Sequence, residues 1–143
     1  MASGLAGCRK TAPDKANQAV EAATVKQSLD RLKTELAAQK KKFMALREQV
    51  DAIPAELDGF GEVRSRFYAT EEGRGTTDAK AAWLSGRLDA AASAGNRAEL
   101  EQISKDIAQT YADLRKIDDL HVKLLHQVMA FQRRAPPPAG PKP

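Results

Sequence analysis

The sequence predicts an all-α protein, an elongated up-down-up three-helix bundle with coiled-coil-like packing and a broken middle helix. Two long segments, residues 14–53 and 97–133, contain neither glycine nor proline. Apolar residues recur in both at alternating intervals of three and four residues, the spacing of helices that pack as coiled coils. The chain has 143 residues, enough for one domain, and only 5% of them are aromatic, which indicates a thin core of Ala, Leu and Val.

The first helix is expected over residues 14–53, after a flexible linker of residues 1–13. Pro13 suits a helix start, because the N–H of a residue in the first turn has no partner within the helix. At roughly 1.5 Å per residue this helix would be about 60 Å long. Nine of its ten heptad a and d positions, here called the seam, are apolar, and Gln39 is the exception. The seam consists of Ala22, Val25, Leu29, Leu32, Leu36, Gln39, Phe43, Leu46, Val50 and Ile53.

The middle of the chain is predicted to form two shorter helical pieces separated by a loop. Pro54 ends the first helix, because the residue before a proline is disfavoured in the α conformation. The first piece has apolar positions at Leu57, Phe60, Val63 and Phe67. Residues 71–77 contain no apolar side chain and are predicted to be a loop, with Thr76 or Thr77 capping the next piece. The second piece, about residues 78–94, has apolar positions at Trp83, Leu84, Leu88 and Ala91.

The last helix is expected from Arg97 to about Arg133. Gly95 can end the preceding helix in a left-handed conformation, and Asn96 with Glu99 has the pattern of a capping box. Eight of ten seam positions are apolar in the series Leu100, Ile103, Ile107, Thr110, Leu114, Ile117, His121, Leu124, Val128 and Phe131. The bundle is therefore expected over residues 14–134, and the proline-rich residues 135–143 are predicted to form a disordered, extended tail.

Charged residues beside the seams predict that the first and last helices run parallel. The e positions of the first helix are the basic residues Lys26, Lys33, Lys40 and Arg47, and the g positions of the last begin with the acidic residues Glu99, Asp106 and Asp113. Because g faces e between parallel neighbours, we expect the pairs Lys26–Glu99, Lys33–Asp106 and Lys40–Asp113. Each exposed pair contributes on the order of a few tenths of a kcal/mol, but three in register favour this topology. In the alternative, the middle pieces form their own hairpin and the bundle has four helices.

Composition and charge argue against several classes of function. The formal net charge is +4, but the 23 basic and 19 acidic residues are interspersed. No ladder of aromatic residues accompanies the basic ones, so nucleic-acid binding is not expected. No apolar run approaches the roughly 18 residues needed to cross a bilayer. The single cysteine excludes an internal disulfide.

The segment Leu5-Ala6-Gly7-Cys8 resembles the lipobox of bacterial lipoproteins, in which a leucine and two small residues precede the cysteine that is acylated. The resemblance implies cleavage before Cys8 and a lipid anchor on its thiol. Seven residues precede Cys8, too few for the basic start and apolar stretch of a signal peptide, so the resemblance also implies a native start upstream of Met1. Arg9 stands where this class of protein would carry an Asp for retention in the inner membrane, which favours the outer membrane.

Other candidate sites have structural explanations. His121 in the seam is expected to be a polar core residue that helps fix register, and His126 lies off that face, with no Cys or carboxylate pair to complete a metal set. Gln39 and Thr110 are likewise expected to specify register. Residues 73–77 lack the Gly-Lys-Ser/Thr ending of a phosphate-binding loop. Trp83 is expected to be buried against the outer helices. We therefore expect no enzymatic activity, no metal and no cofactor.

The sequence thus favours a non-enzymatic helical-bundle lipoprotein that acts as a spacer, adaptor or accessory subunit in the bacterial cell envelope. Its expected partners are the membrane, through a lipid on Cys8, and an unidentified envelope protein. The expected location is the periplasmic face of the outer membrane. The alternative is a soluble, cytoplasmic coiled-coil interaction module that could form homo-oligomers.

Overall fold

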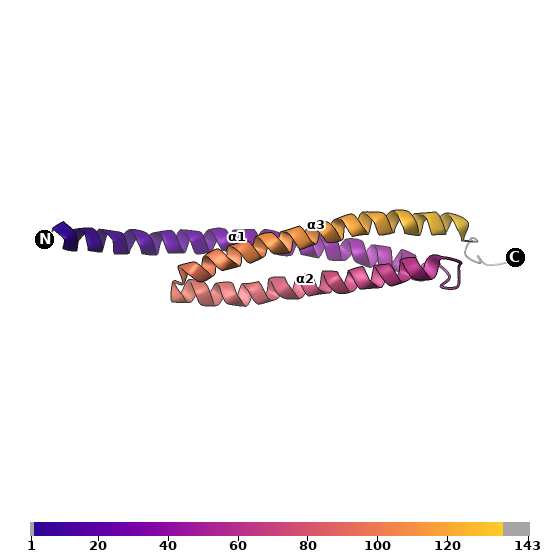
Figure 1. Cartoon of the computed structure of the whole chain (residues 1–143), viewed down its shortest axis with the longest axis horizontal. Coiled ribbons are helices and arrows are strands. Elements are labelled where there is room, and N and C mark those ends of the chain that lie inside the picture. Colours follow the sequence, from indigo (N-terminus) through magenta and orange to yellow (C-terminus); the bar gives the residue numbers. More distant parts are fainter. Residues whose placement is uncertain (1, 136–143) are drawn as a thin grey trace.

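The computed structural model describes the backbone of residues 2–135 and the side chains of residues 21–135. Three helices pack against one another: α1 (Ala2–Ala52), α2 (Phe60–Ala94) and α3 (Arg97–Arg134). They lie side by side along one long axis, with α1 and α3 running in the same direction and α2 running back (Figure 1). The described residues contain no strand. The predicted up-down-up three-helix bundle is therefore confirmed, and the four-helix alternative is wrong.

The first helix begins earlier than predicted. We expected a linker up to Pro13, but α1 starts at Ala2 and includes that proline. Alanine, the strongest helix former, recurs at Ala2, Ala6 and Ala12, and a proline inside a helix removes one backbone hydrogen bond without always ending it. Of the predicted tail over residues 135–143, Ala135 follows the end of α3, and the remainder lies outside the described residues.

The middle helix is unbroken, so the predicted loop over residues 71–77 is wrong. A seam with alternating intervals of three and four residues runs through the whole of α2 at Phe60, Val63, Phe67, Thr70, Arg74, Thr77, Ala81, Leu84, Leu88 and Ala91. The threonine hydroxyls in this stretch hydrogen-bond within the helix: Thr76 donates to the carbonyl of Glu72, and Thr77 to that of Gly73. The polar residues thus continue the seam that the flanking apolar residues define.

Both connections between helices use a glycine in the left-handed conformation. Gly59 precedes α2 with φ of 82°, and Gly95 follows it with φ of 64°. The predicted stop at Gly95 is thereby confirmed. Asn96 then caps α3, because its side-chain oxygen accepts a 3.1 Å hydrogen bond from the N–H of Glu99.

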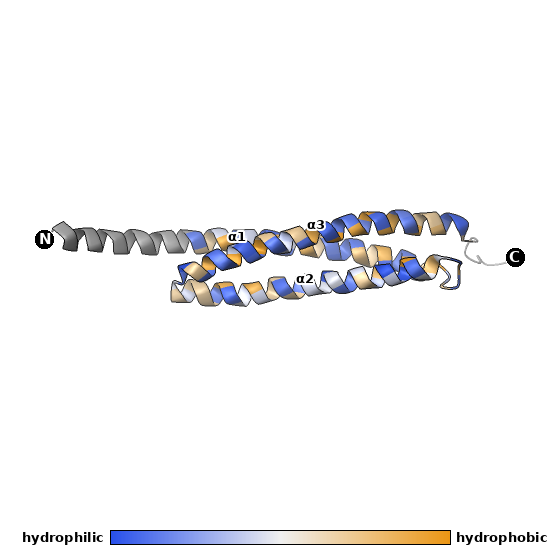
Figure 2. Ribbon diagram, viewed as in Figure 1, coloured by the Kyte–Doolittle hydropathy of each residue, from blue (hydrophilic) through white to orange (hydrophobic). Residues whose placement is uncertain are grey.

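The core consists of two apolar clusters. One lies toward the α2–α3 connection and contains residues such as Leu32, Leu84 and Ile103. The other lies toward the α1–α2 connection and contains Phe43, Phe60 and other large side chains. Figure 2 shows apolar residues recurring along each helix between hydrophilic ones, as this packing requires.

Although α1 and α3 are parallel, the three charge pairs predicted between them do not form. Arg87 of α2 forms ion pairs with Glu99 and Asp106, so the g side of α3 faces α2. Lys33 and Lys40 line a groove between α1 and α2, so the e side of α1 also faces α2. The topology was predicted correctly, but from the wrong pairs.

The α1–α3 contact instead uses the opposite side of each helix. Gln132 at an e position of α3 donates a 3.1 Å hydrogen bond to Gln49 at a g position of α1. Tyr111, at another e position of α3, lies near Glu35, at a g position of α1. The pKa of Tyr111 is raised mainly by burial and to a smaller extent by the charge of Glu35. Parallel neighbours therefore still pair g with e, but the g positions belong to α1 and the e positions to α3, the reverse of the prediction.

Candidate functional site

Four polar side chains are buried in the core. Gln39 from α1, with Arg74 and Thr77 from α2, forms a polar layer between the two apolar clusters, and Thr110 from α3 lies within the cluster toward the α2–α3 connection. Each occupies a seam position, so the packing of the helices directs all four side chains inward. Gln39 and Thr110 were predicted to interrupt the seam, whereas Arg74 was missed.

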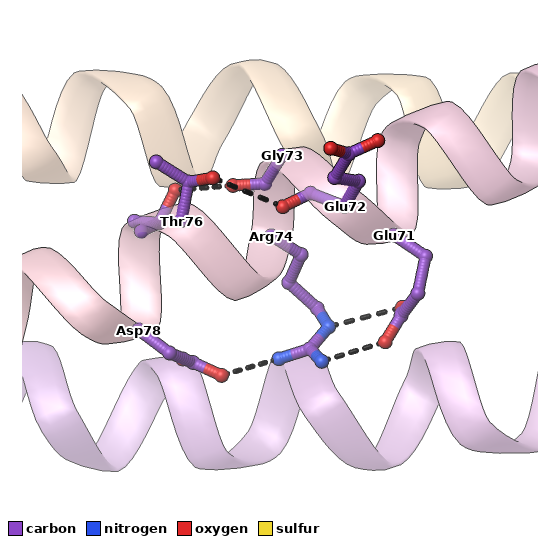
Figure 3. Close-up of polar contacts among 7 residues, drawn as sticks. Glu71, Glu72, Gly73, Arg74, Thr76 and Asp78 are labelled. Atoms are coloured by element: carbon purple, nitrogen blue, oxygen red, sulfur yellow. Dashed lines mark hydrogen bonds and ion pairs between the residues drawn. The ribbon is translucent and has the colours of Figure 1, made fainter.

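Arg74 is 6% exposed and forms ion pairs with two carboxylates of its own helix. Its Nε and one terminal nitrogen donate to the two oxygens of Glu71 at 3.0 and 2.6 Å, and the other terminal nitrogen donates to Asp78 at 2.5 Å. Figure 3 shows the guanidinium between these carboxylates. The hydrogen bond to Glu71, with the weaker effect of Asp78, raises the pKa of Arg74 despite its burial. The arginine therefore stays charged and paired in the core.

Gln39 joins the two parallel helices. Its side-chain nitrogen donates to the backbone oxygen of Leu114 at 3.0 Å and to the carboxylate of Asp118 at 2.9 Å. Its side-chain oxygen is buried and accepts no hydrogen bond. A buried acceptor without a partner costs stability, so this layer is less favourable than an apolar one would be.

A second arginine joins α2 to α3. Arg87 Nε donates to Glu99 at 2.6 Å, and a terminal nitrogen donates to Asp106 at 2.7 Å. The hydrogen bond from Arg87 lowers the pKa of Asp106. The guanidinium also lies 4.5 Å from the ring centre of Trp83. This tryptophan is 57% exposed, so its predicted burial is wrong; it lies beside the seam rather than in it.

The two histidines have different surroundings. His121 is partly buried at its seam position, with its ring 5.0 Å from that of Phe43 and its Nε2 3.3 Å from the backbone oxygen of Lys42. His126 is exposed. Within residues 21–135, no group of three or more His, Cys, Asp or Glu side chains could hold a metal ion.

The e positions of α1 carry three exposed lysines, Lys26, Lys33 and Lys40. No hydrogen bond or ion pair joins any of them to another described residue. Lys33 and Lys40 border an open groove of about 380 Å³ between α1 and α2, together with Leu36, Ala37, Asp78, Ala82 and Ser85. We call this the α1/α2 groove. It combines unpaired positive charge with small apolar side chains.

The predicted lipidation site, Cys8, lies outside the residues whose side chains are described. Glu21, the first residue with a described side chain, forms a 3.1 Å ion pair with Arg97 at the start of α3. The chain therefore enters the described bundle at the end formed by the α2–α3 connection. No helix in the described part of the chain is long and apolar enough to cross a membrane.

Arg74 could have been found in the sequence. Continuing the intervals of three and four residues from Phe67 gives Thr70, Arg74, Thr77 and then the apolar Ala81.

Comparisons with known proteins find no matching protein family, no similar curated protein and no similar solved structure.

Proposed function

We propose that this protein is a non-enzymatic spacer or adaptor of the bacterial cell envelope, anchored to the membrane by a lipid on Cys8. The observation that carries the proposal is the position of Glu21 beside Arg97, at one end of an elongated bundle. A lipid on Cys8 would hold this end toward the membrane, because Cys8 precedes Glu21 in the chain. The 35 residues of α2 would then separate the α1–α2 connection from that end by about 50 Å.

The contacts between helices support the role of a stiff spacer. Arg87 joins α2 to α3 through two carboxylates, and Gln39 joins α1 to α3 inside the core. Polar groups with specific partners disfavour sliding of one helix along another, since sliding would leave them buried without a partner. A bundle held in one register keeps its two ends at a fixed separation.

The test is expression of the native gene with its upstream sequence in a bacterial host fed an alkyne-labelled fatty acid. We expect label on the peptide that begins at Cys8, partition into detergent, and sedimentation with outer-membrane fractions. Several acyl chains give stable anchoring, at about 0.8 kcal/mol per buried CH₂. Cys8→Ser should abolish labelling and partition, while circular dichroism of the bundle stays unchanged. An unmodified thiol in a soluble cytoplasmic protein would overturn the proposal in favour of a soluble interaction module.

A further inference from the structure

Three unpaired lysines form a regular row along α1. Lys26, Lys33 and Lys40 are seven residues apart, so their positions repeat about every 10.5 Å along the helix. All three are exposed, and none has an ion-pair partner among the described residues. The next residue in the row, Arg47, differs because it forms a 3.8 Å ion pair with Asp51.

Arg74 explains why Lys33 and Lys40, the two lysines of the row that border the α1/α2 groove, have no ion-pair partner. Antiparallel helices face each other through their e positions, and the e positions of α2 include Glu71 and Asp78. These carboxylates would be the natural partners of the α1 lysines, but both are bonded to Arg74. Asp78 lines the α1/α2 groove beside Lys33 and Lys40, and its charge is already compensated. The groove therefore carries a net positive charge.

The shape of the α1/α2 groove suits a helix. Buried Leu36 lies at its base, and exposed Ala37 and Ala82 form its walls. Gly75 follows the same side of α2, and the space beside its α carbon is open. Small residues allow the close approach of another helix, as between the helices of a bundle.

We propose that the α1/α2 groove binds an acidic amphipathic helix of a partner protein, which packs as a fourth helix. Its apolar residues would cover Ala37 and Ala82, and carboxylates repeated every seventh residue would pair with the lysine row. The proposal rests on the adaptor function and names the chemical class of its partner. Charge complementarity carries it, since the spacing of the lysines matches the heptad repeat of such a helix.

A helix fits this surface better than a flat anionic bilayer or a nucleic acid does. Acidic residues are exposed at outward-facing f positions of both helices that border the groove, Glu48 on α1 and Glu72 on α2. They would repel a broad negative surface, whereas a single helix lying in the groove contacts the lysines between them.

The probe is a fluorescein-labelled helical peptide of about 21 residues, three heptads, with leucines on one face and glutamates every seventh residue beside it. Binding to the full-length chain is measured by fluorescence anisotropy, at low salt and at about 0.5 M salt. We expect saturable binding that weakens with salt. Lys33→Glu/Lys40→Glu should lower the affinity by about tenfold or more, because like charges then face the glutamates.

Two further variants test whether peptide binding depends on the groove itself or only on the overall charge of the protein. Lys105→Glu/Lys116→Glu makes the same charge change on exposed positions of α3 and should alter the affinity by less than about twofold. Ala82→Trp fills the groove without changing charge and should also abolish binding. Circular dichroism shows whether each variant is folded.

An equal loss of affinity in the α3 variant would overturn the proposal, as would unchanged binding in Ala82→Trp. It would also fail if vesicles with about 30% phosphatidylglycerol, or a single strand of about 20 nucleotides, bound the groove and the peptide did not. Cys8→Ser should bind the peptide normally. Absence of peptide binding with intact lipid labelling would therefore reject this inference alone. Absence of lipid labelling with normal peptide binding would reject only the membrane anchor.

Discussion

The side-chain amide of Gln39 in α1 donates a 2.9 Å hydrogen bond to Asp118 in α3, so a partly buried polar contact joins the two parallel helices. The oxygen of the same amide is buried without a partner. We expect Gln39→Leu to stabilise the bundle by about 1 kcal/mol, because it removes an unpaired acceptor and fills a seam position with an apolar side chain. Urea unfolding monitored by circular dichroism measures this difference.

Gln39→Ala provides the comparison, since it also removes the polar group but leaves a cavity, and it should destabilise the bundle. If Gln39→Leu also lowers stability by 1 kcal/mol or more, the side-chain oxygen has a favourable partner in solution and our account of the polar layer is wrong.

A second prediction concerns Arg74. Arg74→Met leaves the carboxylates of Glu71 and Asp78 near each other without a compensating charge, and it should cost about 2–4 kcal/mol. Adding Glu71→Gln and Asp78→Asn removes that repulsion and should restore most of the stability. Chemical denaturation at neutral pH compares the three proteins. Equal stability of wild type and Arg74→Met would show that the arginine does not hold the two carboxylates.

A third prediction follows from Arg87, whose hydrogen bond lowers the pKa of Asp106. A carboxyl with a lowered folded-state pKa stabilises the protein above its unfolded pKa of about 3.9, and this contribution disappears as pH falls through the folded-state value. Asp106→Asn should therefore destabilise the bundle at neutral pH and make progressively less difference below about pH 4.

Asp113→Asn is the matched control for Asp106→Asn. Asp113 is also at a g position of α3, but it accepts a hydrogen bond from Gln109 and forms no ion pair among the described residues. Urea unfolding across the acid range should show a smaller dependence on pH for this substitution. An equal dependence in both would contradict the role given to Arg87.

A fourth prediction tests the core. Leu36 and Leu114 are 3% and 4% exposed, so Leu36→Asp or Leu114→Asp places an unpaired charge in the apolar cluster. Such a charge costs several kcal/mol, against a total stability of about 5–15 kcal/mol, and should unfold the domain. Ala45→Asp, at an exposed position of α1, should leave the melting temperature nearly unchanged. Unchanged helicity and melting of either leucine variant would mean that the seam is not the core.

The seam residues of α1 and α3 could be predicted from the sequence because apolar side chains recur there without interruption by glycine or proline. The continuity of α2 was missed because Gly73 and Gly75 flank a polar seam position, and the local composition resembles a loop. Only the register of the apolar residues on both sides shows that Arg74 lies inside. Without that register, the sequence does not reveal that Arg87 faces α3, and it pairs the acidic residues of α3 with the wrong helix.

The side of the α1–α3 pair on which α2 lies could not be predicted from α1 and α3 alone. Two arrangements have the same helix directions. In the first, the e side of α1 faces the g side of α3. In the second, the g side of α1 faces the e side of α3. The charges of α1 and α3 fit the first, but the second allows α2 to pair with α3 through Arg87 and brings Gln39 to Asp118.

The last prediction distinguishes these two arrangements by zero-length carboxyl–amine cross-linking followed by peptide mapping. Lys33 and Asp78 line the same groove, and Lys80 lies close enough to Asp106 to help lower the pKa of that carboxyl. Both pairs should therefore cross-link within a monomer. Lys33 and Asp106 should not cross-link, because Lys33 on α1 and Asp106 on α3 each face α2 rather than each other. The links join α1 to α2 and α2 to α3. Recovery of Lys33–Asp106 in a monomer, with Lys80–Asp106 absent, would place α2 on the opposite side and remove the structural basis of the α1/α2 groove.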